Sequence, residues 1–167
     1  MVEVKELSES LRYREGVFSA ISAGFFFILV GAIFVTTPNL FSKILDFFGE
    51  LDIVRVPHTK IFLPAPEFPR AHSVVYSAVT QFSFVWGLFQ IVILALRFVA
   101  RSPLSKKAET VSNLVFWLGA SFLAYTFLNE TTTATTWFAF WAGVIMLIGL
   151  SLIIRAVILA VRMAMTK

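Results

Sequence analysis

The sequence predicts an all-α integral membrane protein, with four transmembrane helices in an up-down-up-down bundle and an amphipathic interfacial helix in the outer loop. The first reason is composition, since 58% of the 167 residues are hydrophobic, against about 45–50% in soluble domains. A soluble domain of this size exposes too much surface to hide that excess in one core. The second reason is that four stretches reach the length of about 20 mostly apolar residues that a transmembrane helix needs.

The four predicted spans belong to a single membrane domain. The first follows a segment, MVEVKELSESLRYREG, that carries four Glu and is not typical of a cleavable signal. In chain order, the spans are residues 17–36, 73–97, 111–128 and 136–160, the last with a cytoplasmic extension. The remaining segments are a cytoplasmic N-terminal segment at 1–16, an outer loop at 37–72, a cytoplasmic turn at 98–110 and a second outer loop at 129–135.

Lysine and arginine residues predict how these spans are oriented. Ten of them lie on one side, in the N-terminal segment, the 98–110 turn and the C-terminal end, with Arg97 and Arg155 counted near the span ends. Four lie in the 37–72 loop. The positive-inside rule then predicts a multi-pass protein of the plasma membrane with both termini in the cytoplasm. Trp137 and Trp141 fall at the outer end of the fourth span, where interfacial aromatic residues are common.

The connections predict which spans are neighbours. Ser102 and Pro103 are typical of a helix N-cap followed by the first helical position. The third span is therefore expected to begin as a helix before it enters the lipid. Because the connections at 98–110 and 129–135 are short, the third span is expected to pack beside the second and the fourth.

A short amphipathic helix is predicted at residues 38–48, at the start of the outer loop. Thr37 suits its N-cap, Pro38 its first turn and Gly49 its end. Such a helix can lie in the outer lipid interface, or it can pack on the spans of this chain or of a neighbour, and both interpretations stay open. The apolar side of this helix includes Phe41, Ile44, Leu45 and Phe48.

The rest of the outer loop, residues 50–72, is predicted to be extended, because four Pro residues exclude a continuous helix. The runs IVRV and KIFL are typical of short β-strands. Apolar residues in an extended loop need cover. A membrane surface, a partner subunit or a second copy of the chain would supply it.

The sequence lacks signatures of catalysis, and we predict no enzyme activity, no cofactor and no nucleic-acid partner. It contains no Cys and no G-x-S-x-G, H-E-x-x-H or P-loop motif. His58 and His72 are weak candidates for a metal site in the outer loop, and solvated or headgroup-facing histidines are the favoured interpretation. Asn129, Glu130 and Thr131 match the glycosylation triplet on the predicted outer side.

A polar seam follows the second predicted span. When Ser73 is taken as heptad position a, most residues at positions a and d are polar or small. Ser77 flanks the same side. In a left-handed membrane bundle this side faces neighbouring helices. The opposite side, with Val79, Phe89 and Ile93, is expected to face lipid. The polar seam consists of Ser73, Tyr76, Ser77, Thr80, Ser83, Gly87, Gln90 and Arg97.

Two interpretations of the polar seam stay open, and helix packing is the favoured one, because small and hydroxylated residues let helices approach closely. Small-residue spacings occur in the other spans at Ala20 and Gly24, Ala120 and Ala124, and Ala139 and Gly143. In the alternative, an oligomer arranges the seam around a water-filled pore. Arg97 would lie at its inner end, with Arg70 and His72 near its outer mouth, and these basic residues would favour anions.

The sequence therefore predicts a non-enzymatic membrane protein that acts through helix association, as a homo-oligomer or as an accessory or structural subunit of a membrane complex. Its expected partners are membrane lipids and either copies of itself or other membrane subunits. The alternative is an oligomeric channel whose second span lines a neutral polar, anion-favouring pore. No Asp, Glu, Lys or His lies deep in a predicted span, which argues against a proton-coupled transporter.

Overall fold

The computed structural model describes the backbone of residues 2–165 and the side chains of Tyr13, residues 15–161 and Ala164. Its long helices are α1 (Val2–Thr36), α3 (Ser73–Val99), α4 (Leu104–Phe127) and α5 (Ala134–Met165). Between α1 and α3 lie a short helix, α2 (Leu40–Gly49), two strands, β1 (Leu51–Arg55) and β2 (Phe62–Pro66), and a turn of 3-10 helix, η1 (Pro69–His72).

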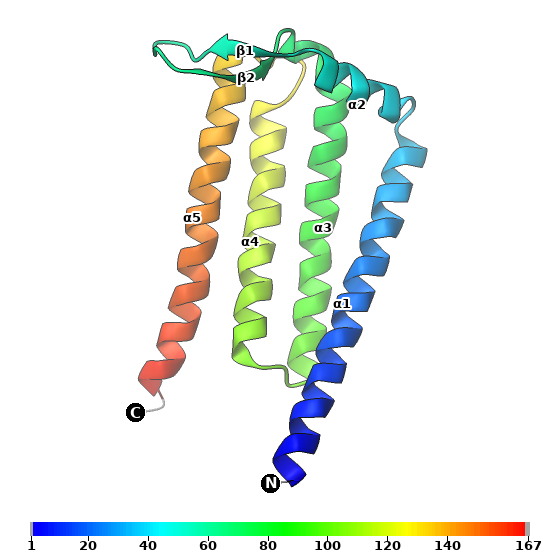
Figure 1. Ribbon diagram of the computed structural model, residues 1–167, viewed down its shortest axis with the longest axis vertical. Coiled ribbons are helices and arrows are strands. Elements are labelled where there is room, and N and C mark those ends of the chain that lie inside the picture. The colour runs from blue at the N-terminus through cyan, green and yellow to red at the C-terminus, as the bar shows by residue number, and fades with distance from the viewer. Residues whose placement is uncertain (1, 166–167) are drawn as a thin grey trace.

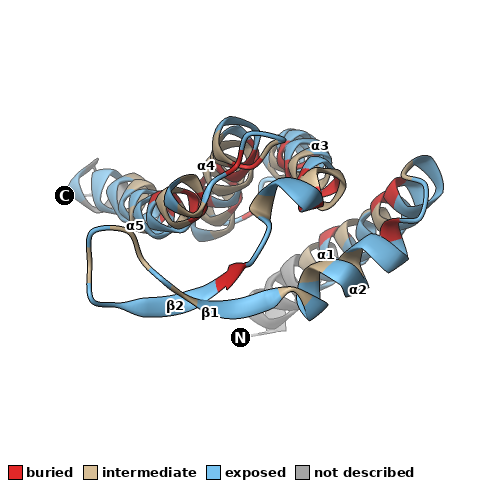
Figure 2. Cartoon of the chain, turned by 90° about the horizontal axis from the view of Figure 1, so that it is seen from above, coloured by how far each residue is buried: buried red, intermediate tan, exposed pale blue. Residues whose placement is uncertain are grey.

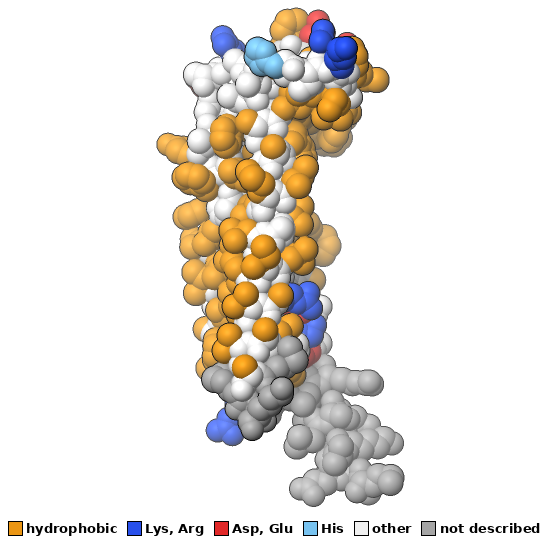
Figure 3. Space-filling model, turned by 90° about the vertical axis from the view of Figure 1, so that its left-hand side faces the viewer, with side chains coloured by type: hydrophobic (Ala, Val, Ile, Leu, Met, Phe, Trp, Pro, Cys, Tyr) orange, Lys and Arg blue, Asp and Glu red, His pale blue; other side chains and the backbone are white. Residues whose placement is uncertain are grey.

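Four helices in the described part of the chain are long and apolar enough to cross a membrane, which confirms the predicted number of such helices. Within the most apolar window of each, between 6 and 28% of the residues are buried in the chain. The other residues need an apolar surrounding, because water solvates large hydrophobic side chains poorly. Figure 3 shows hydrophobic side chains along the helices and Lys and Arg side chains near the two ends. This distribution is typical of a multi-pass membrane protein.

The long helices form an open row, seen from above in Figure 2. The α4 helix packs between α3 and α5, whereas α1 packs chiefly against α3. The α2 helix and the β1–β2 hairpin lie across one end of the row, which we call the cap end (Figure 1). The α3–α4 connection lies at the opposite end, which we call the turn end (Figure 1). Helices α1 and α5 therefore occupy opposite edges of the row.

Some helices begin earlier than the predicted spans. The α1 helix is continuous from Val2, so the N-terminal segment and the first span form one helix, and α4 begins at Leu104, before its predicted span. Left-handed backbone conformations at Asn39 (φ 56°) and Arg101 (φ 52°) turn the chain ahead of α2 and α4. Asn39 is the N-cap of α2, so the prediction of Thr37 was wrong; Asn tolerates this conformation better than Thr.

The segment between α1 and α3 contains a hairpin in the region of the two β-like runs. β1 and β2 pair antiparallel, with Ile53 opposite Pro64. Val54 packs against a buried cluster that includes Trp137 of α5, and Trp137 Nε1 donates a hydrogen bond to the Pro64 carbonyl O at 3.3 Å. Because alternate residues of a strand point to opposite faces, Ile53 and Phe62 point away from the helices. Their exposed fractions are 70% and 61%.

Candidate functional site

The polar seam of α3 divides into a buried part and an accessible part. The buried part consists of Tyr76, Ser83, Gly87 and Gln90. The accessible part consists of Ser73, Ser77 and Thr80, which line a cavity at the cap end. Arg97, at the turn end, is half-buried. The two parts differ because α4 covers only one side of α3, and the predicted seam extends beyond the side that it covers.

Small residues of the buried part allow α3 and α4 to approach closely. A Cβ atom at Gly87 would lie 2.6 Å from Leu118 Cδ2 and 3.1 Å from the Leu118 backbone N. A hydrogen bond also joins the two helices, from Ser121 Oγ to the Thr80 carbonyl O at 3.0 Å. These contacts are the ones expected of small and hydroxylated residues between membrane helices. They favour packing over a pore for this part of the seam.

The predicted lipid-facing side of α3 was wrong for two residues. Phe89 and Ile93 are 9% and 2% exposed. The ring of Phe89 stacks on Phe25 of α1, with centroids 3.9 Å apart and an interplanar angle of 9°. Because α1 packs on this side of α3, aromatic contacts rather than lipid cover it. Val79, nearer the cap end, is 44% exposed.

Arg97 forms a polar contact between three helices at the turn end. Its Nη2 lies 3.2 Å from Oε2 of Glu15 on α1. Its Nη1 donates hydrogen bonds to the Lys106 carbonyl O and to Thr110 Oγ1 on α4. The side chains of Arg97 and Glu15 are 13% and 20% exposed. The guanidinium of Arg97 is therefore already paired with groups of its own chain. This pairing makes it less suited to attract ions at the mouth of a pore.

Glu15 is the functional candidate that sequence reasoning missed, because it was assigned to a cytoplasmic leader. The signal that could have found it is its position directly before the first apolar stretch, at the same predicted membrane side as Arg97. Together with Gln90, these residues line a second cavity of about 300 Å³ between α1, α3 and α4. Its charged lining residues are Glu15, Arg97, Lys106 and Glu109. Lys106 Nζ and Glu109 Oε2 also pair, 3.1 Å apart.

His72 lies in a buried aromatic cluster at the cap end. It is 2% exposed, so the prediction of a solvated or headgroup-facing side chain was wrong. Its Nε2 lies 3.1 Å from Glu50 Oε2, and its ring meets Phe47 of α2 edge to face, with centroids 5.1 Å apart. Tyr76 and Trp137 complete the cluster through their contacts with Phe47. His72 therefore joins the hairpin segment to α2 and α3.

His58 lies elsewhere, in the turn between β1 and β2, where it is exposed and has a φ of 61°. Within the described residues, no group of three or more His, Cys, Asp or Glu side chains could hold a metal ion. The two histidines therefore lie in different parts of the cap end. His72 is paired with Glu50 and does not have the further ligands that a metal ion would need.

The amphipathic helix α2 is packed on its own chain along part of its surface. Leu40 and Ile44 contact a cluster formed by α1 and α3. The other predicted apolar residues point outward: Phe41, Leu45 and Phe48 are 63%, 56% and 63% exposed. Packing on the chain and contact with lipid or a neighbour are therefore both compatible with this helix, since one side packs on the protein and the other is exposed.

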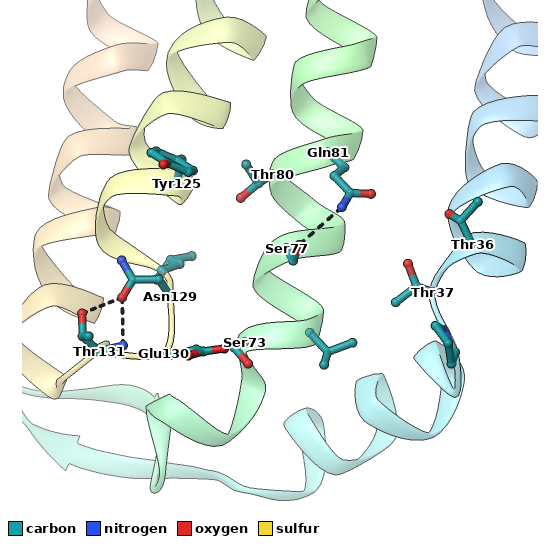
Figure 4. A pocket seen from close by; sticks show the side chains of 13 residues that line it. Thr36, Thr37, Ser73, Ser77, Thr80, Gln81, Tyr125, Asn129, Glu130 and Thr131 are labelled. Carbon is teal, nitrogen blue, oxygen red and sulfur yellow. Dashed lines mark hydrogen bonds between the residues drawn. The ribbon is translucent and has the colours of Figure 1, made fainter.

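The accessible part of the polar seam lines a cavity of about 760 Å³ at the cap end, which we call the cap cavity. In Figure 4 its labelled side chains come from α3, from the end of α1 and from the end of α4 with the loop that follows. Hydroxyl groups come from Thr36, Thr37, Ser73, Ser77, Thr80 and Thr131. Amides come from Gln81 and Asn129, a phenol from Tyr125 and a carboxylate from Glu130.

Several of these hydroxyls already donate to the backbone. Thr36 Oγ1 donates to the Ala32 carbonyl O and Thr80 Oγ1 to the Tyr76 carbonyl O, both at 2.9 Å. Each of these hydroxyls keeps acceptor capacity, because a hydroxyl has two acceptor sites besides its one donor. Gln81 Nε2 contacts Ser77 Oγ at 3.4 Å, a long hydrogen bond (Figure 4). The cap cavity is therefore rich in acceptors and adjustable donors.

The charge of the cap cavity differs from the sequence-based expectation. Among the residues that the structure describes, Glu130 is the one charged side chain in its lining, and Arg70 and His72 do not line it. A carboxylate without a basic neighbour disfavours anions. The predicted anion preference at the outer mouth of a pore is therefore not supported by this cavity.

Comparison with protein-family models, with curated protein sequences and with solved structures gives no match. Function must therefore be argued from the site itself.

Proposed function

We propose that this chain is a non-enzymatic protein of the plasma membrane that acts through association, either with copies of itself or as an accessory or structural subunit of a membrane complex. The four long helices cross the bilayer up-down-up-down, with the cap end outside and both termini in the cytoplasm. The charge distribution supports this orientation, since Lys and Arg are more frequent at the turn end and its flanks than in the segment before α3.

The observation that carries the association proposal is the outward face of the β1–β2 hairpin. Ile53 and Phe62 are 70% and 61% exposed, and they lie beyond the ends of the long helices. Large apolar side chains in that position need cover from a membrane surface or a partner. Phe41, Leu45 and Phe48 extend this apolar surface along α2, where an interfacial position is also favourable.

The association proposal is tested with the double variant Ile53→Ser, Phe62→Ser, and with Lys60→Ser as the matched control on an exposed polar residue of the same hairpin. Native mass spectrometry in mild detergent is expected to give an oligomer or a complex for the wild type and for the control. The double variant is expected to be mainly a monomer. A wild-type monomer without any co-purifying partner would contradict the proposal.

The orientation can be tested separately, because the chain contains no Cys. Lys60→Cys, in the hairpin turn, is expected to react with a membrane-impermeant maleimide on intact cells. Ser105→Cys, at the start of α4, is expected to react only after the membrane is opened. The reverse pattern would place the cap end inside.

The channel is retained as the alternative, because Ser73, Ser77 and Thr80 remain accessible rather than packed. A pore in an oligomer would have to be lined by these residues and by Gln81, and not by the buried part of the seam. Purified protein in liposomes is then expected to pass ions or small solutes, and Gln81→Leu to reduce the flux. Tight vesicles would eliminate this alternative.

A further inference from the structure

We propose that the cap cavity and an adjoining groove hold one lipid whose headgroup is uncharged and rich in hydroxyls, such as a glycosyl or glyceryl headgroup. The headgroup occupies the cap cavity and an acyl chain occupies the groove. This proposal goes beyond association, since it depends on the chain lying in a membrane and not on its oligomeric state.

The headgroup chemistry follows from the lining of the cap cavity. In the described part of the chain, the hydroxyls of Thr37 and Ser73 have no hydrogen-bond partner, and the amide of Gln81 has one long contact at 3.4 Å. Tyr125 is 75% exposed and offers a ring face and a phenol. Hydroxyls, amides and an aromatic ring together suit a ligand that both donates and accepts many hydrogen bonds.

The charge of the cavity selects against the common anionic headgroups. Anionic lipids are recognised by Lys and Arg clusters, and none of the described residues in this lining is basic. Glu130 adds a negative charge at the rim, which repels a phosphodiester. The volume of about 760 Å³ lies within the range of about 300–1,000 Å³ that is usual for ligand sites.

A groove of about 480 Å³ continues from the cap cavity between α3 and α4. The two share Thr80, Gln81 and Tyr125 in their linings. The groove extends farther from the cap end, to Phe84 on α3 and Leu118 on α4. Along α4 the groove runs from Tyr125 to Leu118, a rise of about 10 Å at about 1.5 Å per residue, which is long enough for the upper part of an acyl chain.

The wall of this groove is almost entirely carbon, although it includes hydroxyl residues. The reason is that the Ser121 hydroxyl is turned into the α3–α4 contact, while the Thr80 hydroxyl donates within α3. Ser121 Oγ donates to the Thr80 carbonyl O at 3.0 Å, and Thr80 Oγ1 donates to the Tyr76 carbonyl O at 2.9 Å. Methyl and methylene groups are left facing the groove. A polar cavity that passes into an apolar groove toward the membrane centre matches an amphiphile, and it does not match a free polyol.

The binding experiment uses the full chain in a detergent without a sugar headgroup and measures lipid retention by native mass spectrometry. The probes are monoglucosyl-dioleoylglycerol, two phospholipids with the same acyl chains (phosphatidylglycerol and phosphatidylethanolamine), and free glucose. The glucolipid is expected to bind one per chain, at least about tenfold more tightly than either phospholipid, while free glucose does not bind. Equal binding of a phospholipid, or binding of free glucose alone, would overturn the proposal.

Variants locate the site. Gln81→Leu and Thr80→Val are each expected to weaken glucolipid binding about tenfold, which corresponds to one or two hydrogen bonds. Thr126→Val is the matched control, because its Oγ1 also donates to the carbonyl O four residues earlier, at 2.8 Å from Phe122 O, but it lies outside the cavity lining. Tyr125→Ala, at an exposed position, serves if Thr80→Val fails to fold. Unchanged binding in the folded variants would place the lipid elsewhere.

Discussion

The contact between α3 and α4 and the contact between α1 and α3 are built from different side chains. Small residues bring α3 and α4 together, as at Gly87, where a Cβ would lie 2.6 Å from Leu118 Cδ2. Aromatic rings separate α1 from α3, as in the stack of Phe25 on Phe89. Without small residues at the crossing, backbones stay farther apart, since ring stacking alone needs several ångströms.

The two contacts also differ in whether the small residues of the helices lie in a helix contact. Ala120 and Ala124 of α4 are 9% and 0% exposed, whereas Gly24 and Gly31 of α1 have no described atom within 4 Å of a Cβ position. The small-residue spacing of α1 therefore has no counterpart in the described part of this chain. The α3–α4–α5 row is the tightly packed unit. The α1 helix is attached to it by aromatic rings, by one ion pair and by the aliphatic contacts of Leu29 and Ile33 with Ala78 of α3.

The largest loss in the free energy of unfolding is expected from Gly87→Ala, which disturbs the close contact between α3 and α4. The added methyl group would displace Leu118 or move α3 away from α4, and overpacking of this kind costs about 1–3 kcal/mol. The free energy of unfolding, measured by titration with SDS in mixed micelles, is expected to fall by that amount. Gly149→Ala is the matched control, because no described atom lies within 4 Å of its Cβ position. If both variants lose equal stability, the close approach at Gly87 is not what matters.

A smaller loss in the free energy of unfolding is expected from Glu15→Gln and Arg97→Met, which remove the ion pair between α1 and α3. Both side chains are partly exposed, so solvent screens the pair, and a double-mutant cycle is expected to give a coupling of about 1 kcal/mol. Glu109→Gln is the control, since its carboxylate pairs within α4 with Lys106 at about 40% exposure and is expected to change stability by less than about 0.5 kcal/mol. A coupling near zero would mean that apolar contacts alone attach α1 to α3.

The smallest loss in the free energy of unfolding is expected from Ser112→Ala. This variant tests whether the α4–α5 contact, like the α3–α4 contact, depends little on any single hydrogen bond. Ser112 Oγ donates to the Ser151 carbonyl O at 2.7 Å in a buried position. Hydrogen bonds between membrane helices average about 0.6 kcal/mol, and the unfolding titration is expected to show a loss of that size. Thr126→Val, which removes an exposed bond within one helix, should leave the titration unchanged. A loss above about 2 kcal/mol would indicate that the contact depends on this bond far more than is usual.

Much of the fold could be predicted from the sequence because its signals are local. A run of apolar residues is long enough to span a bilayer regardless of its neighbours. The pair Ser102 and Pro103 marks the start of α4 at Leu104 with an error of one residue. The runs IVRV and KIFL overlap β1 and β2 for the same reason, since β propensity acts over a few positions. Their pairing into a hairpin was not predicted.

Site residues were harder to predict, because helical period indicates which residues share a face but not which helix covers that face. Ser83 and Gln90 were expected to point inward and are 3% and 7% exposed. Phe89 and Ile93 share a different face that looks equally suited to lipid, and α1 covers it. Glu15 and His72 gain partners far away in the sequence, Arg97 and Glu50, and no local pattern specifies such pairs.

The sequence by itself determined that the chain has four helices long and apolar enough for a bilayer and that a polar seam runs along one of them, because length, hydropathy and spacing are properties of each segment. Only the tertiary structure decided how that seam is divided, with Gly87 packed against α4 and Ser77 left open in the cap cavity. The physical reason is that burial depends on the distance and direction of neighbouring helices. Those are set by the volumes of side chains from different segments meeting in space.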